Sequence, residues 1–218
     1  MKLITSLIIW QLLLVLAPQN NALGQAADSL LNAKEFTTLD DALKTPDQVL
    51  RLNLSNQRFD KFPAEIIKFK NLQYLSLRND HLKVVPAEIA SLQNLRVLDL
   101  GGNDFSLLPA SFRKLRNLEE LYLDEDKNLN LIKDFEVLSA LPKLRVLHLE
   151  NDGIKKLPTN VGKLRRLESL YLGNNLLRFV PPQITGLKNL RYLDVNHNLI
   201  KPQFHLEPPA GTGVKINF

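Results

Sequence analysis

The feature that most constrains the fold of this chain is a short leucine pattern that returns at a fixed interval. The pattern reads Leu-x-x-Leu-x-Leu, with Val49 replacing a leucine in the first copy and Val195 in the last. Its seven copies begin at residues 49, 72, 95, 118, 144, 167 and 190, so the intervals are 23, 23, 23, 26, 23 and 23 residues. A period of this length is typical of stacked structural units that are each too small to bury their apolar residues alone.

Each copy continues in the same manner after the leucine pattern. A polar residue follows three positions after the last aliphatic residue of the pattern, as Gln57, Asp80, Asn103, Asp126, Asp152, Asn175 and Asn198. Five copies then carry an apolar residue followed by proline, at Phe62-Pro63, Val85-Pro86, Leu108-Pro109, Leu157-Pro158 and Val180-Pro181. We expect the polar residue to hydrogen-bond the backbone of the neighbouring turn, and the proline to begin a half of the unit that is not a strand.

Residues 49 to about 200 resemble the leucine-rich repeat family, in the 23-residue form whose second half reads Leu-Pro-x-x-Ile-x-x-Leu-x-x-Leu. The resemblance implies an α/β solenoid: a curved, right-handed stack with a parallel β-sheet on its concave face. Short helical or irregular segments would form the convex face. We expect residues 1–24 to be a signal peptide, 25–48 an N-terminal capping segment with a short helix, 49–201 the seven repeats, and 202–218 a C-terminal cap.

The N-terminus has the order of a secretory signal peptide, with Lys2 before an almost wholly apolar run from Leu3 to Leu16 and cleavage expected after Gly24. The apolar run is shorter than the roughly 20 residues that a spanning helix needs. We therefore expect a secreted or periplasmic protein with no stable membrane span after cleavage, the alternative being a retained anchor. The chain has no cysteine, which excludes disulfides, thiolate zinc sites and a catalytic cysteine and favours a bacterial source.

Two further segments depart from the regular repeat. Thr38 precedes a short amphipathic run, which predicts a capping helix, and Ile216 follows Leu193 by 23 residues, which predicts a terminal half-repeat strand. The copy that begins at Leu118 has three extra residues and lacks the proline pair. Its insertion is either a longer convex helix or bulge placed for a partner, or a tolerated loop variation.

Function is expected on the concave face, which takes the side chains that alternate with the strand leucines. All four tyrosines of the chain fall at these positions, together with five acidic residues, whereas the basic residues lie mainly on the convex half. Tyrosine and acidic groups favour a protein or peptide partner of basic or polar character. The candidate partner-binding residues are Tyr74, Arg78, Asp99, Glu120, Tyr122, Asp124, His148, Glu150, Tyr171, Tyr192 and Asp194.

Other function classes have little support in the sequence. Phosphates would be repelled by the acidic groove, so we expect no nucleic acid. His148 and Glu150 beside Tyr122 and Asp124 form the one place where metal or acid–base chemistry is conceivable, but no catalytic motif is present. We therefore expect a monomer that is not an enzyme and has no cofactor, metal site or catalytic residue. The alternative is a structural or adhesion protein of the cell envelope or the extracellular space, with glycans as its candidate ligands.

Overall fold

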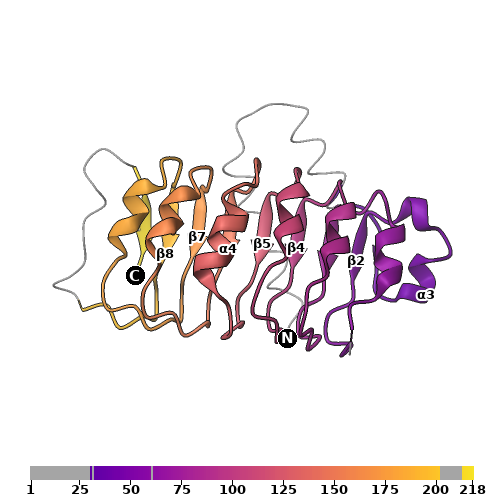
Figure 1. The fold of residues 1–218 in the computed structure, drawn as a ribbon, viewed down its shortest axis with the longest axis horizontal. Coiled ribbons are helices and arrows are strands. Elements are labelled where there is room, and N and C mark those ends of the chain that lie inside the picture. The colour runs from indigo at the N-terminus through magenta and orange to yellow at the C-terminus, as the bar shows by residue number, and fades with distance from the viewer. Residues whose placement is uncertain (1–29, 31, 60, 202–212) are drawn as a thin grey trace.

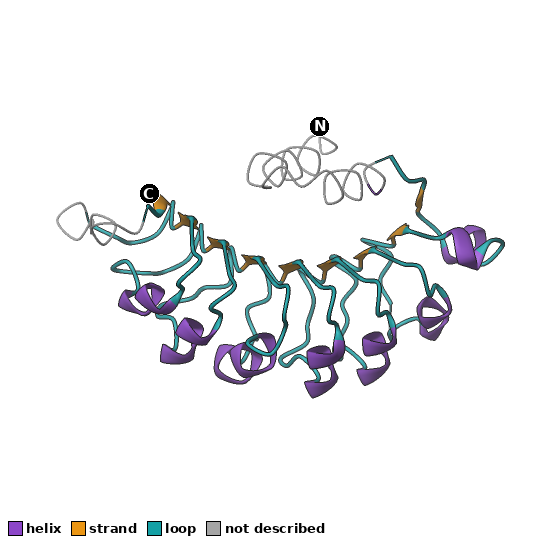
Figure 2. Cartoon of the chain, turned by 90° about the horizontal axis from the view of Figure 1, so that it is seen from above, coloured by secondary structure: helices purple, strands orange, loops and turns teal. Residues whose placement is uncertain are grey.

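The computed structural model describes residue 30 and residues 32–59, 61–201 and 213–218. The expected signal peptide lies outside these residues, as do parts of both expected caps. The described chain is an open arc of stacked turns, with strands along its inner side and short helices along its outer side (Figures 1 and 2). No helix in the described part of the chain is long and apolar enough to cross a membrane.

Within the described residues, the concave face is a single sheet of nine parallel strands that follow one another in chain order. One leucine of each repeat pattern lies beside its counterpart in the next strand, from Leu52 and Leu75 onward to Leu193 and Ile216. The strands are β1 (Glu35–Phe36), β2 (Arg51–Asn53), β3 (Tyr74–Ser76), β4 (Val97–Asp99), β5 (Glu120–Tyr122), β6 (Val146–His148), β7 (Ser169–Tyr171), β8 (Tyr192–Asp194) and β9 (Lys215–Asn217). This arrangement confirms the predicted α/β solenoid.

Short 3₁₀ helices form most of the convex face. Five of them begin directly after a proline of the repeat, whose fixed φ and missing N–H suit a helix start. These elements are η1 (Pro46–Gln48), η2 (Ala64–Lys68), η3 (Ala87–Ser91), η4 (Ala110–Lys114), η5 (Thr159–Lys163) and η6 (Pro182–Gly186). The repeat with three extra residues forms the α-helix α4 (Leu131–Leu138) instead, and its N-cap is Asn130, whose side chain accepts a hydrogen bond from the Lys133 N–H.

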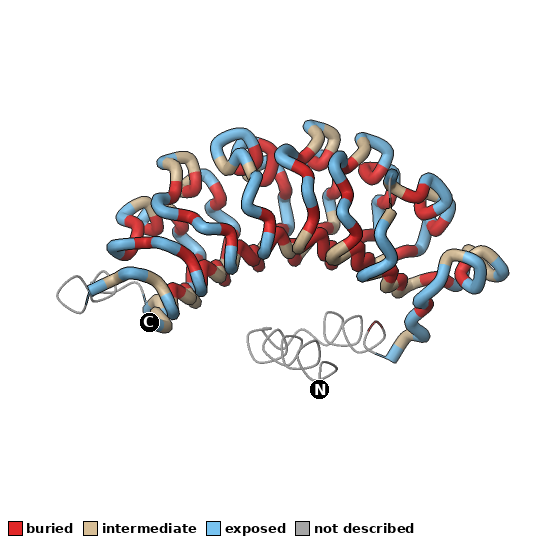
Figure 3. The backbone as a smooth tube through the Cα atoms, turned by 90° about the horizontal axis from the view of Figure 1, so that it is seen from below, coloured by how far each residue is buried: buried red, intermediate tan, exposed pale blue. Residues whose placement is uncertain are grey.

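The repeated leucines fill one continuous core between the sheet and the convex helices. Leu98, Leu121 and Leu170 are fully buried, and Phe69 and Phe112 fill the space beneath the convex helices. Figure 3 shows buried residues along the concave strands and at intervals in the outer turns, where exposed residues alternate with them. Each unit therefore buries its apolar residues against its two neighbours, as the stacking of small units requires.

Asparagine at the polar position of the repeat connects its own turn to the preceding one. The Asn103 side-chain oxygen accepts hydrogen bonds from the N–H groups of Asp80 and Leu82, at 3.2 and 3.0 Å. Its amide nitrogen donates to the carbonyls of Leu77 and Leu100, at 2.8 and 2.6 Å. Buried backbone groups are thereby satisfied. Equivalent bonds are made by Asn175 and Asn198.

Aspartate takes this position in three turns and leaves one atom without a partner. Asp126 Oδ1 accepts from the Asn103 N–H at 2.6 Å, and Asp152 Oδ1 accepts from the Asp126 N–H at 2.9 Å. The Oδ2 atoms of Asp80, Asp126 and Asp152 are buried and have no hydrogen-bond partner. Burial raises the pKa of Asp126 to about 9 and that of Asp152 to about 8, and it also raises the pKa of Asp80. A protonated carboxyl can donate from this position as the asparagine amide does.

The ends of the described stack carry additional elements. The helix α3 (Leu39–Ala42) begins at Thr38, whose hydroxyl accepts from the Asp41 N–H at 3.3 Å. Strand β1 pairs with β2, and β9 pairs with β8 so that Ile216 lies beside Leu193. The edge of the repeat sheet is therefore extended by a short strand on each side.

Candidate functional site

Three aromatic rings form a row across the middle of the concave face. Tyr122, His148 and Tyr171 occupy the same register position on β5, β6 and β7. The ring centroids of Tyr122 and His148 are 4.0 Å apart with an interplanar angle of 9°, and those of His148 and Tyr171 are 4.3 Å apart at 7°. Neighbouring strands lie about 4.8 Å apart, so rings at one register position stack face to face. Tyr192 extends the row, with its ring centroid 5.3 Å from that of Tyr171.

Two carboxylates hold the central imidazole of this row. His148 Nε2 lies 3.1 Å from Glu120 Oε1, and His148 Nδ1 lies 3.4 Å from Glu150 Oε1. The Tyr122 hydroxyl donates to the same Glu120 oxygen at 2.7 Å. Burial alone would lower the pKa of His148, but the hydrogen bonds and charges of the two glutamates raise it to about 9. His148 is therefore a cation at neutral pH.

A second group of paired side chains forms around Arg78, on one side of the ring row. Its guanidinium donates to both carboxylate oxygens of Asp124, at 2.7 and 2.6 Å, and its Nε donates to Asp99 at 3.0 Å. Asp124 lies two turns away, and the arginine crosses Gly101 to reach it. A Cβ atom at Gly101 would lie 2.7 Å from the guanidinium, so the missing side chain gives the arginine its path. Burial raises the pKa of Asp99 even though Arg78 opposes the shift.

Four of the eleven candidate residues are almost fully buried on the concave face. Asp99 and Asp124 are each 9% exposed, Glu120 is 1% and His148 is 3% exposed. These side chains are buried because they pair with concave side chains of nearby strands, and these contacts cover them from solvent. The other candidates are half-buried, namely Tyr74, Arg78, Tyr122, Glu150, Tyr171, Tyr192 and Asp194.

Two candidates lie apart from both groups. The Tyr74 ring is covered by Arg51, whose guanidinium carbon lies 4.7 Å from the ring centroid. Asp194 accepts hydrogen bonds from the Asn196 N–H at 2.9 Å and the Asn217 side chain at 3.2 Å. The concave cluster, the name used below, therefore consists of nine candidates that the structure brings together: Arg78, Asp99, Asp124, Glu120, Tyr122, His148, Glu150, Tyr171 and Tyr192.

The chemistry open to the concave cluster is that of a fixed hydrogen-bonding surface. Among the described residues, no three or more histidine, aspartate or glutamate side chains are placed to hold a metal ion. The Oε2 atoms of Glu120 and Glu150 have no hydrogen-bond partner but are buried, so they are closed to a partner in this arrangement. The cluster thus offers the half-buried rings of Tyr122 and Tyr171 in positions that the stack has already fixed.

Comparisons with known proteins agree with this architecture. A family profile described as a leucine-rich repeat region matches residues 47–142, and one described as a leucine rich repeat matches residues 142–200. The chain belongs to the leucine-rich repeat family. Leucine-rich repeat domains generally mediate protein–protein interactions and are typically not enzymes. A search of the curated proteins found no significant match.

Solved leucine-rich repeat structures share the fold. The chain is 27% identical to a leucine-rich repeat protein of Leptospira interrogans, with a TM-score of 0.51, over 76% of this chain and 53% of that one. It is 26% identical to the plant peptide hormone receptor RGFR1 in complex with RGF2, with a TM-score of 0.52, over 70% and 25%. It is 24% identical to a chain of the Drosophila Toll–Spatzle complex, with a TM-score of 0.63, over 75% of this chain and 22% of that one. The chain thus spans about half or less of the length of these proteins.

Proposed function

We propose that this leucine-rich repeat chain is a non-enzymatic recognition module that binds a protein or peptide through its concave face. The observation that carries the proposal is the stacked row of Tyr122, His148 and Tyr171, held by Glu120 and Glu150. Rings fixed in this way lose little conformational entropy when a partner binds. Two similar leucine-rich repeat structures are themselves complexes, one with RGF2 and one with Spatzle.

The charges of the concave face support a partner of basic or polar character. In the concave cluster, four carboxyl groups face two cationic groups, those of Arg78 and His148. Asp194 adds a fifth carboxylate beside the row. A partner that brings lysine or arginine would complement this excess, whereas the phosphates of a nucleic acid would be repelled.

The glycan-binding alternative has less support from the geometry. The faces of the imidazole ring are covered by Tyr122 and Tyr171 on its two sides. A sugar that packs on an aromatic side chain needs an open ring face, which is the extended apolar part of the ring. The concave row presents ring edges, which suit hydrogen bonding to a polypeptide.

We also propose that the protein is exported and acts as a monomer outside the cytoplasm. Support comes from the apolar segment that ends before the expected cleavage after Gly24. Detection of a processed chain that begins at Gln25 in the culture medium or the periplasm would test this, and a full-length chain retained in the cytoplasm would contradict it.

Affinity capture from the producing organism's secreted fraction, followed by measurement of binding to the purified partner, tests the proposed function. The double variant Tyr122→Ala/Tyr171→Ala should bind at least about tenfold more weakly, since the central aromatic contacts of an interface carry most of its energy. Phe179→Ala is the matched control, because Phe179 is an exposed aromatic residue that is not on the concave sheet. Equal affinities of wild type and double variant, with the fold intact by circular dichroism, would refute concave binding.

A further inference from the structure

A second surface lies at the edge of the solenoid where the chain leaves each strand and turns toward the convex side. It consists of Lys61 and residues 81–84, 104–107, 127–133, 153–156, 176–179 and 199–201, which we call the edge loops. Backbone hydrogen bonds hold successive edge loops side by side, for example from the Asp104 N–H to the Leu82 carbonyl and from the Asn130 N–H to the Ser106 carbonyl, both 3.0 Å. The edge loops therefore form one continuous strip along the stack.

The exposed apolar side chains of the described structure are concentrated on this strip. Seven large apolar residues are exposed, and six of them belong to the edge loops. Val84 is 69% exposed and Ile132 is 60% exposed, although each lies next to core residues of its own repeat. The six are Val84, Leu107, Ile132, Leu176, Phe179 and Leu199. A single exposed apolar residue needs no explanation, but six along one edge indicate an interaction surface.

The same strip is strongly basic. Eight of its side chains are exposed lysines or arginines, and none has an ion-pair partner among the described residues: Lys61, Lys83, Lys127, Lys133, Lys155, Lys156, Arg178 and Lys201. The one carboxylate among the described edge-loop residues is Asp104, which lies 3.2 Å from His81. The edge is therefore opposite in charge to the concave face.

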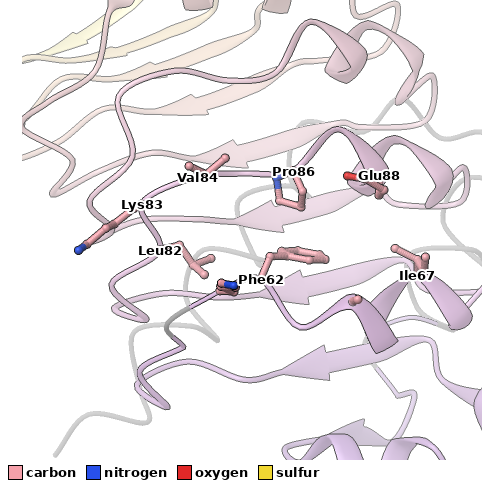
Figure 4. A pocket seen from close by; sticks show the side chains of 9 residues that line it. Phe62, Ile67, Leu82, Lys83, Val84, Pro86 and Glu88 are labelled. Atoms are coloured by element: carbon pink, nitrogen blue, oxygen red, sulfur yellow. The ribbon is translucent and has the colours of Figure 1, made fainter.

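Two apolar hollows open beside these basic residues. The first has a volume of about 300 Å³ and is lined mainly by apolar side chains, among them Phe62, Leu82 and Val84. Two lysines and one carboxylate, Lys61, Lys83 and Glu88, also lie at its wall (Figure 4). The second, of about 680 Å³, lies between the start of α4 and the next turn, and its lining includes Leu129, Leu131, Ile132, Lys156 and Leu157. Apolar depressions and unpaired cations thus alternate along the edge.

The shape of the solenoid makes this strip nearly planar. The stack bends as an arc in Figure 2, and in Figure 1 the same turns form a band of nearly constant height. The loops at one edge of the band therefore end close to a common plane. Six strand intervals of about 4.8 Å give the strip a length of about 29 Å on the sheet side. A flat surface can contact all the edge loops at once, whereas the concave cluster faces inward.

We propose that the edge loops dock on the surface of an anionic lipid bilayer. The lysines and Arg178 lie at the level of the lipid headgroups, and the side chains of Val84, Ile132 and Phe179 enter the adjoining apolar layer. Charge complementarity selects anionic lipid as the occupant, since the described residues of the strip carry eight cations and one carboxylate, against which Glu88 beside the first hollow adds a single further acid. This surface is separate from the concave cluster, so docking would hold the protein at a membrane while its concave face stays open to a partner.

Sedimentation with vesicles tests the proposal. The full chain is mixed with vesicles of phosphatidylcholine alone or of equal parts phosphatidylcholine and phosphatidylglycerol, and the ratio of the two partition constants is measured. Each lysine near an anionic surface contributes about a fivefold preference. Lys83→Ala/Lys155→Ala/Lys156→Ala should therefore reduce the ratio by about 100-fold. The N-terminal apolar segment is common to all variants and cancels in the comparison.

A variant with the same change of net charge serves as the control. Lys114→Ala/Lys163→Ala/Lys188→Ala removes three exposed lysines from the convex side, and its ratio should fall by less than about tenfold. Ile132→Ser/Phe179→Ser should weaken binding to mixed vesicles without changing the salt dependence, because these residues carry no charge. Equal loss in both lysine variants, no preference of wild type for mixed vesicles, or binding to polyglutamate but not to vesicles would each overturn the proposal. None of these results depends on the concave partner.

Discussion

Replacing Asp126 by asparagine should stabilise the protein, and increasingly so as the pH rises. Asp126 occupies the repeat position that Asn103 occupies one turn earlier. The Asn103 side chain donates hydrogen bonds to the carbonyls of Leu77 and Leu100, whereas the buried Oδ2 of Asp126 has no partner. Burial raises the pKa of Asp126 to about 9 from an ordinary value of 3.8. The folded chain therefore keeps this carboxyl protonated at neutral pH, while the unfolded chain ionises it.

The size of the effect follows from this pKa difference. Below pH 3.8 the carboxyl is neutral in both states and does not influence folding. Above pH 3.8 the unfolded state is favoured by about 1.4 kcal/mol per pH unit, up to the folded pKa of about 9. At pH 7 the accumulated penalty is about 4 kcal/mol, which sets the largest gain expected from Asp126→Asn. The asparagine amide would also supply the donor that an ionised carboxyl lacks.

Urea denaturation of wild type and Asp126→Asn at pH 5, 6, 7 and 8 measures this difference. The free-energy gap between the two proteins should widen by about 4 kcal/mol from pH 5 to pH 8. The gap is the informative quantity, because Asp80 and Asp152 give both proteins a further pH dependence of the same sign. Asp47→Asn makes the same substitution at an exposed position outside the core and serves as the matched control. A constant gap, or an Asp126→Asn protein that is less stable than wild type at pH 8, would refute the reasoning.

Two further predictions concern the concave cluster. Gly101→Val should displace the Arg78 guanidinium, leave Asp99 and Asp124 without their cation, and lower the free energy of unfolding by about 3 kcal/mol in a urea titration. Unchanged stability would show that the arginine has another route to Asp124. In an NMR titration, the ring protons of His148 should shift with a midpoint near pH 9, because Glu120 and Glu150 favour the charged imidazole. A midpoint below pH 7 would mean that the two glutamates do not hold the ring in solution.

The repeat sequence predicts the backbone of this fold because one physical requirement recurs in every turn. A leucine that must face the core at one position of the first repeat must do so at the same position of the next, so the interval of 23 residues determines both strand register and core. For the three-residue insertion in the repeat that begins at Leu118, the sequence alone allows either a longer convex helix or bulge or a tolerated loop variation. The structure forms α4 there because the extra residues bring Phe135 and Leu138 into the core on one helical face.

The repeat register predicts that His148 lies beside Tyr122, but the pairing of His148 with Glu120 and of Arg78 with Asp124 was not predicted. Tyr122, His148 and Tyr171 fall at one position of three successive repeats, and residues at one position of a parallel stack lie side by side. The pairing of Arg78 with Asp124 across Gly101 does not follow from equivalent repeat positions. It joins residues 46 positions apart and depends on the conformation of the arginine side chain. The repeat pattern treats aspartate and asparagine as one polar class, so it does not predict the buried carboxyl oxygens of Asp80, Asp126 and Asp152 that have no partner.

The repeat also explains how one small chain can carry two surfaces of opposite charge. Concave positions and edge positions are different positions of the same repeat unit. The row of polar residues that contains Asn103 and Asp126 lies between them and is buried in the five central turns. A substitution at the edge, such as Lys156→Ala, therefore leaves the packing around His148 unchanged, and effects at such separated sites should add. Tyr171→Ala combined with Lys156→Ala should accordingly lose partner binding and vesicle binding by the same factors as the two single variants. A coupling of more than about 0.5 kcal/mol in either assay would mean that the two surfaces bind one ligand together.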